Sequence, residues 1–226
     1  MPVNDWKGKS MVIFGDSIQW QDGKPYGQGD IGAIAVGMGT IIQRKLGFSE
    51  YDNQGVSGVP MAEGTVNGEG THQAILDYLS FSDKDLVIIA AGTNDFKLNV
   101  PIGELGGIGN PSVDPLTFYG AYHEAVEHIL TVKPTIRIVL CTPLQRDNNG
   151  YDVNHKNASG HKLIDYVKAI QFIGDMYGLP ICDLYRNSGI TELTFSTFLM
   201  DGLHPNDLGY QRMGGYTSGI IQSIGV

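Results

Sequence analysis

The sequence predicts an α/β protein of three layers, in which a parallel sheet lies between two layers of helices. Short apolar runs of strand length alternate along the chain with longer stretches whose apolar residues recur at helical spacing. Such alternation forms βαβ units, and these units build parallel sheets. The 226 residues are enough for one sizeable core, so a single domain over residues 1–226 is expected.

Five apolar runs have the length of buried strands, at residues 11–14, 51–56, 86–91, 136–141 and 180–184. Helical spacing predicts helices over residues 31–46, 72–79, 115–132 and 162–177, and a last, glycine-weakened helix over 208–221. Asp114 and Pro115 are typical of an N-cap and a first helical residue, and Gly178 is typical of a helix end.

Two stretches fit no regular element, residues 97–111 and 145–159. Irregular loops of this length inside a compact domain are usually functional or mobile. Ligands of open α/β sheets bind at the carboxyl ends of the strands. Because each stretch follows a predicted strand, we expect both to lie near a ligand site.

Charge and composition exclude several kinds of partner. The formal net charge is −9 and the 15 Lys and Arg residues are spread along the chain, which argues against nucleic acid. No apolar run approaches the roughly 18 residues of a membrane span, and the first residues lack the apolar region of a signal peptide. The expected locations are cytoplasmic, on a phage virion, or outside the cell after removal of a leader. The six His residues are scattered without metal spacing, so no metal is expected.

Four short blocks carry groups suited to nucleophilic catalysis. The first strand runs into Gly15-Asp16-Ser17, which places a hydroxyl at the carboxyl edge of the sheet near a helix start, where a developing anion is favoured. Residues 53–58, Asn-Gln-Gly-Val-Ser-Gly, suggest a turn whose N–H groups are open to a ligand. Taken alone, either block also fits an ordinary turn.

The third and fourth blocks add an amide and an imidazole. A buried strand delivers Thr93-Asn94-Asp95 to the same edge, where the Asn94 amide is a neutral donor for an oxyanion. Asp201 and His204 are three residues apart, so the carboxylate can bond Nδ1 and leave Nε2 as a base. Pro205 favours an extended His204. A helix cap and a solvated loop histidine are the alternatives for these blocks.

In order and spacing the four blocks resemble the signature blocks of the SGNH hydrolases, also called the GDSL esterase/lipase family, and the resemblance covers essentially the whole chain. It implies a five-stranded parallel sheet in flavodoxin-like order, and no metal or organic cofactor. Ile18 and Gln19 depart from the Leu and Thr frequent in that family, which bears on substrate size. No Gly-x-Ser-x-Gly surrounds Ser17, so the nucleophile elbow of the α/β-hydrolases is absent.

The resemblance implies that Ser17 is a nucleophile, His204 its base and Asp201 the residue that orients the base. It also implies an oxyanion hole formed by the backbone N–H groups of Ser17 and Gly58 and by the side chain of Asn94. Three further residues are candidates for substrate contact, although Asp95 is favoured as a structural residue that caps a helix or braces a loop. These are Asp16, Asp95 and His155.

The polar, glycine-rich loops lack the apolar surface of a lipid-facing lid. The expected reaction is therefore hydrolysis of a short acyl ester, most simply an acetyl ester, on a carbohydrate. A lipase, lysophospholipase or thioesterase is the alternative enzyme. A glycan-binding module without turnover is the alternative of another class, and it is disfavoured because every triad and oxyanion position is filled. A bacterial or phage origin fits the acidic, glycine-rich chain.

Overall fold

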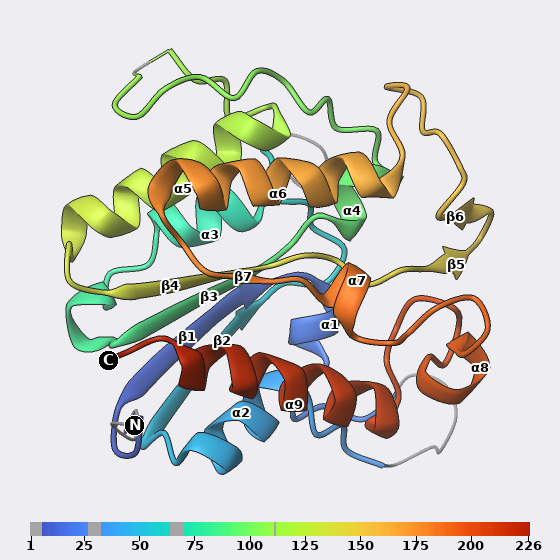
Figure 1. The fold of residues 1–226 in the computed structure, drawn as a ribbon, viewed down its shortest axis with the longest axis horizontal. Coiled ribbons are helices and arrows are strands. Elements are labelled where there is room, and N and C mark those ends of the chain that lie inside the picture. The colour runs from blue at the N-terminus through green and yellow to red at the C-terminus, as the bar shows by residue number, and fades with distance from the viewer. Residues whose placement is uncertain (1–5, 27–32, 64–69, 111) are drawn as a thin grey trace.

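A five-stranded parallel sheet forms the centre of the computed structural model, which describes residues 6–26, 33–63, 70–110 and 112–226. The strand order is β2-β1-β3-β4-β7 (Figure 1), which is the predicted flavodoxin-like order. The strands are β1 (Ser10–Gly15), β2 (Glu50–Gly55), β3 (Leu86–Ala90), β4 (Arg137–Cys141) and β7 (Ile181–Cys182). All four pairings between them are parallel.

Helices cover both faces of this sheet, as Figure 1 shows. One face carries α3 (Thr71–Leu76), α5 (Phe118–Val132) and α6 (Leu163–Tyr177), and the other carries α2 (Met38–Leu46) and α9 (Asp207–Ser223). The shorter helices are α1 (Ser17–Trp20), η1 (Phe81–Asp83), α4 (Thr93–Lys97), α7 (Leu184–Asn187) and α8 (Phe195–Phe198). Among the described residues, no helix is both long and apolar enough to cross a bilayer.

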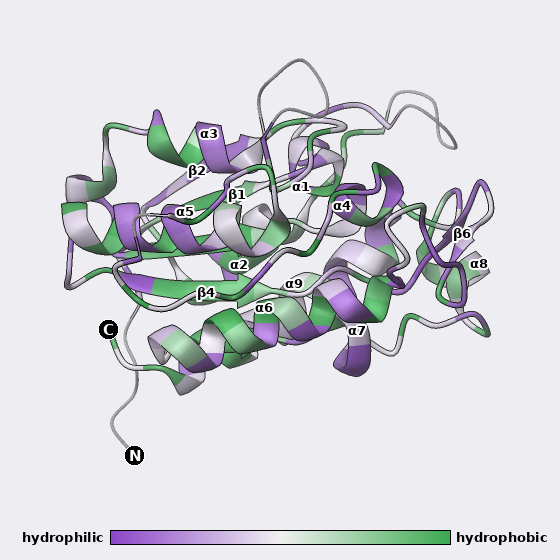
Figure 2. Ribbon diagram, turned by 90° about the horizontal axis from the view of Figure 1, so that it is seen from above, coloured by the Kyte–Doolittle hydropathy of each residue, from purple (hydrophilic) through white to green (hydrophobic). Residues whose placement is uncertain are grey.

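The side chains of β1 divide between two hydrophobic cores because successive residues of a strand point to opposite faces. Val12 and Phe14 belong to the core under α3, α5 and α6, whereas Met11 and Ile13 belong to the core under α2 and α9. All six residues of β1 are buried, as expected for a strand covered on both faces. In Figure 2, α6 alternates hydrophobic and hydrophilic stripes, which is the pattern of a helix with one face on the core.

Several helix boundaries differ from the sequence prediction. The helix α5 begins at Phe118 and not at Pro115, because Thr117 is its N-cap and accepts the Gly120 N–H through Oγ1, while Asp114 closes a turn before it. The helix α2 begins only at Met38, and residues 31–32 of the predicted helix lie outside the described residues. The predicted end at Gly178 is confirmed by its left-handed φ of 64°.

The prediction that residues 145–159 contain no regular element is wrong. They hold a short antiparallel hairpin of β5 (Asp147–Asn148) and β6 (Tyr151–Asp152). Its two connecting residues, Asn149 and Gly150, have φ of 54° and 80°. Asn-Gly is the preferred sequence for a hairpin turn with two positive φ angles, so the signal was present in the sequence.

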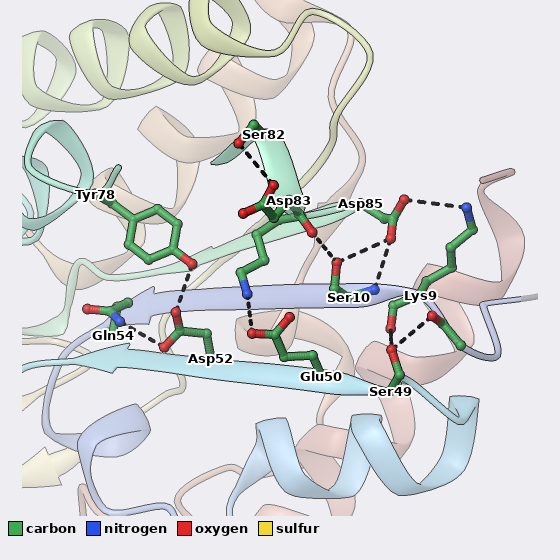
Figure 3. Close-up of polar contacts among 12 residues, drawn as sticks. Lys9, Ser10, Ser49, Glu50, Asp52, Gln54, Tyr78, Ser82, Asp83 and Asp85 are labelled. Atoms are coloured by element: carbon green, nitrogen blue, oxygen red, sulfur yellow. Dashed lines mark hydrogen bonds and ion pairs between the residues drawn. The ribbon is translucent and has the colours of Figure 1, made fainter. Parts of the chain in front are cut away.

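Polar side chains tie the strands together at the edge opposite the carboxyl ends (Figure 3). The Ser10 N–H donates to Asp85 Oδ2 over 2.9 Å and Tyr78 Oη donates to Asp52 Oδ2 over 2.7 Å. The buried Lys84 donates from Nζ to Glu50 Oε1 over 2.7 Å. The contacts of Ser10 and Glu50 lie at the amino ends of β1 and β2, whereas the bond from Tyr78 to Asp52 lies midway along β2.

Two glycines of α9 provide a matched test of the packing between α9 and α2. A Cβ on Gly214 would lie 2.7 Å from Ile41 Cβ, whereas a Cβ on the exposed Gly219 would meet no atom within 4 Å. We expect Gly214→Ala to lower the free energy of unfolding by about 1–3 kcal/mol through overpacking. Gly219→Ala should raise it by about 0.5–1 kcal/mol through helix propensity. Urea denaturation of both variants measures the difference, and equal effects would contradict the close approach.

Candidate active site

The register of the sheet brings three of the sequence blocks to one edge. Gly15, the last residue of β1, pairs with Gly55 of β2 and with Ala90 of β3. The chain therefore leaves all three strands at the same level, and α1, the turn at residues 56–58 and α4 begin side by side. The helix α1 starts at Ser17 because the Asp16 carboxylate accepts the Ile18 N–H over 2.9 Å and caps it.

The fourth block completes a hydrogen-bonded chain of three side chains. Ser17 Oγ lies 3.0 Å from His204 Nε2, and His204 Nδ1 lies 2.8 Å from Asp201 Oδ2. These distances fit an imidazole that donates Nδ1–H to the carboxylate and accepts the hydroxyl proton at Nε2. The structure thus brings together the predicted nucleophile, base and orienting residue from positions 187 residues apart.

The second oxygen of Asp201 fixes the backbone of the same turn. Asp201 Oδ1 accepts the N–H groups of Leu203, over 3.0 Å, and of His204, over 2.7 Å. Partial burial opposes ionisation, but the hydrogen bonds from His204 and Leu203 outweigh it and hold the pKa of the Asp201 carboxyl below its usual value. An ionised Asp201 at neutral pH suits the orientation of an imidazole that becomes charged.

The remaining predicted donors lie beside each other. Asn94 is buried, and its Nδ2 donates to Val59 O over 2.9 Å, which ties the amide to the residue next to Gly58. Gly58 is exposed in the turn after β2, and its φ of 83° favours glycine. One of the two amide hydrogens of Asn94 is used in this bond, so the second is the one available to a ligand.

Two of the three candidates for substrate contact are buried carboxyl groups that support backbone instead. Asp95 is fully buried and accepts the N–H groups of Met61, over 2.8 Å, and Ala62, over 3.1 Å. Burial raises the pKa of Asp95 to about 7 and that of Asp16 to about 6, although backbone hydrogen bonds act in the opposite direction. The two hydrogen bonds tie Asp95 to the backbone of residues 61–62, while substrate contact by Asp16 or Asp95 stays a prediction.

The third candidate, His155, lies in a cluster of aromatic rings. Its ring centroid is 4.8 Å from that of Tyr151 and 5.9 Å from that of Phe96. The backbone N–H of His155 donates to Asp152 Oδ1. His155 does not line the pocket beside Ser17. This placement gives no support to a substrate contact by His155.

A pocket of about 280 Å³ adjoins the Ser17 hydroxyl and the His204 ring. Trp20, which is 38% exposed, and Met200 supply its apolar walls. The Lys24 ammonium lies 4.4 Å from the centroid of the Trp20 ring but does not line the pocket. The other lining residues are polar: Gln21, Ser57 and Asp201.

The sequence did not identify Trp20, Met200 or Ser57 as lining residues of a pocket. No local sequence pattern marks such residues, because the pocket forms only when distant segments meet in the fold. Arg146, which is fully buried close to the site, was also not identified. No group of three or more His, Cys, Asp or Glu side chains suited to a metal occurs in the described part of the chain.

Comparison with solved structures agrees with this fold. A crystal structure with 26% sequence identity has a TM-score of 0.84 and covers 99% of this chain and 100% of its own. A protein from Lactobacillus plantarum has 22% identity and a TM-score of 0.79, with 97% and 99% covered. A possible lipase from Chitinophaga pinensis has 21% identity and a TM-score of 0.73, with 95% and 98% covered. No match was found among curated proteins.

The family model for the GDSL-like lipase/acylhydrolase family matches residues 13–212. This range includes Ser17, Asn94, Asp201 and His204. The chain belongs to the GDSL-like lipase/acylhydrolase family, which confirms the predicted family. In general terms the family supports a serine hydrolase that acts on esters.

The buried carboxyl of Asp95 predicts a pH dependence of stability. With a folded pKa of about 7 against an ordinary value of 3.8, the folded state holds a proton that the unfolded state has lost between about pH 4 and 7. This group therefore makes the free energy of unfolding fall as the pH rises through that window. Asp95→Asn should flatten the dependence, and the exposed Asp77→Asn should leave it unchanged. Thermal unfolding from pH 4 to 8 measures how the stability of each variant changes with pH. If the stability of Asp95→Asn changed with pH as steeply as that of wild type, the raised pKa of Asp95 would be contradicted.

Proposed function

We propose that this protein is a serine esterase that removes acetyl groups from a carbohydrate, with Ser17 as nucleophile and His204, oriented by Asp201, as general base. The observation that carries the proposal is the unbroken chain from Ser17 Oγ through the imidazole to Asp201 Oδ2, at 3.0 and 2.8 Å. This arrangement has the distances that a base needs in order to remove a hydroxyl proton. The proposed catalytic unit is the single domain formed by residues 1–226.

In the first half of the reaction His204 Nε2 takes the Ser17 proton while Ser17 Oγ attacks the ester carbonyl carbon. The negative charge that develops on the carbonyl oxygen is stabilised by the N–H groups of Ser17 and Gly58 and by Asn94 Nδ2. When the tetrahedral intermediate collapses, the alcohol leaves with the proton from His204. The acyl group is then bound to Ser17 Oγ as an ester.

The second half repeats the same steps with water. His204 Nε2 removes a proton from a water molecule, whose oxygen attacks the acyl carbon, and the same three donors stabilise the oxyanion. Collapse releases the carboxylic acid and returns the proton to Ser17 Oγ. Throughout, the ionised Asp201 stabilises the imidazolium that forms twice in each cycle.

The size and lining of the pocket favour a short acyl group on a hydrated alcohol. A space of about 280 Å³ is at the small end of ligand pockets. Most of its lining side chains offer hydroxyl, amide, carboxylate or imidazole groups. The indole of Trp20 adds an amphipathic ring of the kind that packs against sugar C–H groups while its edge stays hydrated.

A lipase or thioesterase is the second candidate, and one observation favours it. Trp20 and Met200 line the pocket, and Val56, next to Ser57, is 43% exposed. An acyl chain longer than the pocket would extend over this apolar rim. A non-catalytic glycan-binding module would use the same Trp20 surface without turnover.

Removal of single groups tests the catalytic assignment. Ser17→Ala should abolish hydrolysis of p-nitrophenyl acetate and labelling by a fluorophosphonate. Asn94→Ala should lower kcat by about 10²- to 10³-fold through loss of one oxyanion donor. Ser57→Ala, which keeps the Ser17–His204 pair, should still be labelled. An Asn94→Ala enzyme as fast as wild type, with an equal melting temperature, would contradict the oxyanion role.

The substrate class is tested by a chain-length series and by acetate release. Activity on p-nitrophenyl esters should peak at C2, and acetylated polysaccharides should release acetate. Trp20→Ala should raise KM for the polysaccharide about tenfold, the loss of roughly 1.4 kcal/mol of stacking, with little change on p-nitrophenyl acetate. A peak at C8 or beyond would favour a lipase, and glycan binding without turnover that survives Ser17→Ala would favour a binding module.

A further inference from the structure

Arg146 is buried completely, which is unusual for a charged side chain. Its Nη1 donates to the backbone oxygen of Thr93, over 3.3 Å, and to Thr93 Oγ1, over 2.9 Å. Its guanidinium lies 5.9 Å from the centroid of the Tyr151 ring. The side chain therefore reaches from the start of the 145–159 segment to the first residue of α4.

The remaining nitrogens of this guanidinium are poorly satisfied. Nε and Nη2 are buried and have no hydrogen-bond partner among the described residues. A buried charge with unpaired N–H groups costs free energy, and an apolar side chain of similar volume is often as stable or more stable. Stability of the fold therefore gives no reason for an arginine at this position.

The contacts on either side of Arg146 join two parts of the proposed catalytic machinery. Thr93, which Arg146 holds, immediately precedes Asn94. The two residues that follow Arg146 hold the turn of the base: the Asp147 N–H donates to Gly202 O over 2.9 Å, and Asn148 Nδ2 donates to Asp201 O over 2.7 Å. Residues 146–148 thus connect an oxyanion donor to the Asp201–His204 turn.

The charge of Arg146 acts on the same site. It favours the ionised form of Asp16, whose pKa burial raises to about 6 and which also interacts with His204. The charged and titratable groups around Arg146 belong to four segments of the chain. Asp16, Asp201 and Tyr151 interact with its charge. Asp147, Asp152 and Glu192 line a cavity of about 50 Å³ beside it.

We propose that Arg146 is a positioning residue for the hydrolysis, which holds Asn94 and the Asp201–His204 turn in register and keeps a buried positive charge beside them. This inference rests on the proposed function. Arg146 does not line the pocket beside Ser17, so it acts on the reaction through Thr93, Asp16 and the turn and not by contact with substrate.

Two substitutions separate its two roles. Arg146→Met removes both the charge and the donors, and it should lower kcat about 10²-fold, the usual effect of a displacement near 1 Å, with KM changed less than about threefold. The fall of kcat at low pH (the acid limb of the pH–kcat profile) should move to higher pH, because the loss of a buried cation near the site disfavours deprotonation of its titrating groups. Arg146→Lys keeps the charge without the planar fork. It should restore the acid limb while kcat stays below wild type.

The melting temperature distinguishes positioning from mere structural support. Arg146→Met should melt at or above the wild-type temperature, since it removes unpaired buried N–H groups. The matched control is Lys84→Met, at the other buried cation of the described residues, which lies at the opposite edge of the sheet with Glu50. Lys84→Met should lower the melting temperature and leave kcat and the pH profile of the folded enzyme unchanged.

Each outcome decides for or against the inference. The inference is overturned if Arg146→Met has the same kcat and the same acid limb as the active wild-type enzyme. It is also overturned if the kcat of Arg146→Met falls only in proportion to the fraction of folded protein. A third contradicting result is an acid limb at the same pH in Arg146→Lys and Arg146→Met. These results leave the proposed function intact, because wild type still hydrolyses p-nitrophenyl acetate. A wild-type protein that neither hydrolyses the ester nor reacts with a fluorophosphonate removes both.

Discussion

The arrangement of the site depends on the hydrogen bonds of one carboxylate, that of Asp201. One of its oxygens accepts two backbone N–H groups of the turn that follows, and the other accepts Nδ1–H of His204. The same group therefore sets both the path of the backbone and the rotation of the ring. Because the ring is fixed at Nδ1, its Nε2 can face only the start of α1, where Ser17 lies. Protonation of this carboxylate would weaken its hydrogen bonds to the turn and to the ring together.

Much of the fold follows from local patterns in the sequence. The five apolar runs are the five strands, and their alternation with amphipathic helices leaves few arrangements other than a doubly wound parallel sheet. In such a sheet the carboxyl ends of neighbouring strands meet, so Ser17, Asn94 and the turn near Gly58 are brought together by topology alone. For this reason, the polar residues that follow each strand predict the place of the site from the sequence alone.

The parts that were not predicted depend on tertiary contacts. The burial of polar side chains is one example: His72 is buried between Glu63 and Glu124, and His123 is buried against Tyr177 Oη. The walls of the pocket are another, since Trp20 and Met200 meet only in the folded chain. The hairpin in residues 145–159 was local and detectable from Asn149-Gly150, but the polar composition of the segment favoured an irregular loop.

The tight contact between the hairpin and the catalytic turn links two segments that are far apart in the chain. A Cβ at residue 202 would overlap the backbone oxygen of Asp147, and Gly202 has a φ of 80°. Any side chain there must displace the hairpin backbone, whatever residue stands at 147. A shortened or absent hairpin would remove this overlap, but the φ of 80° would still favour glycine at position 202, so two independent constraints keep the catalytic turn free of a side chain there.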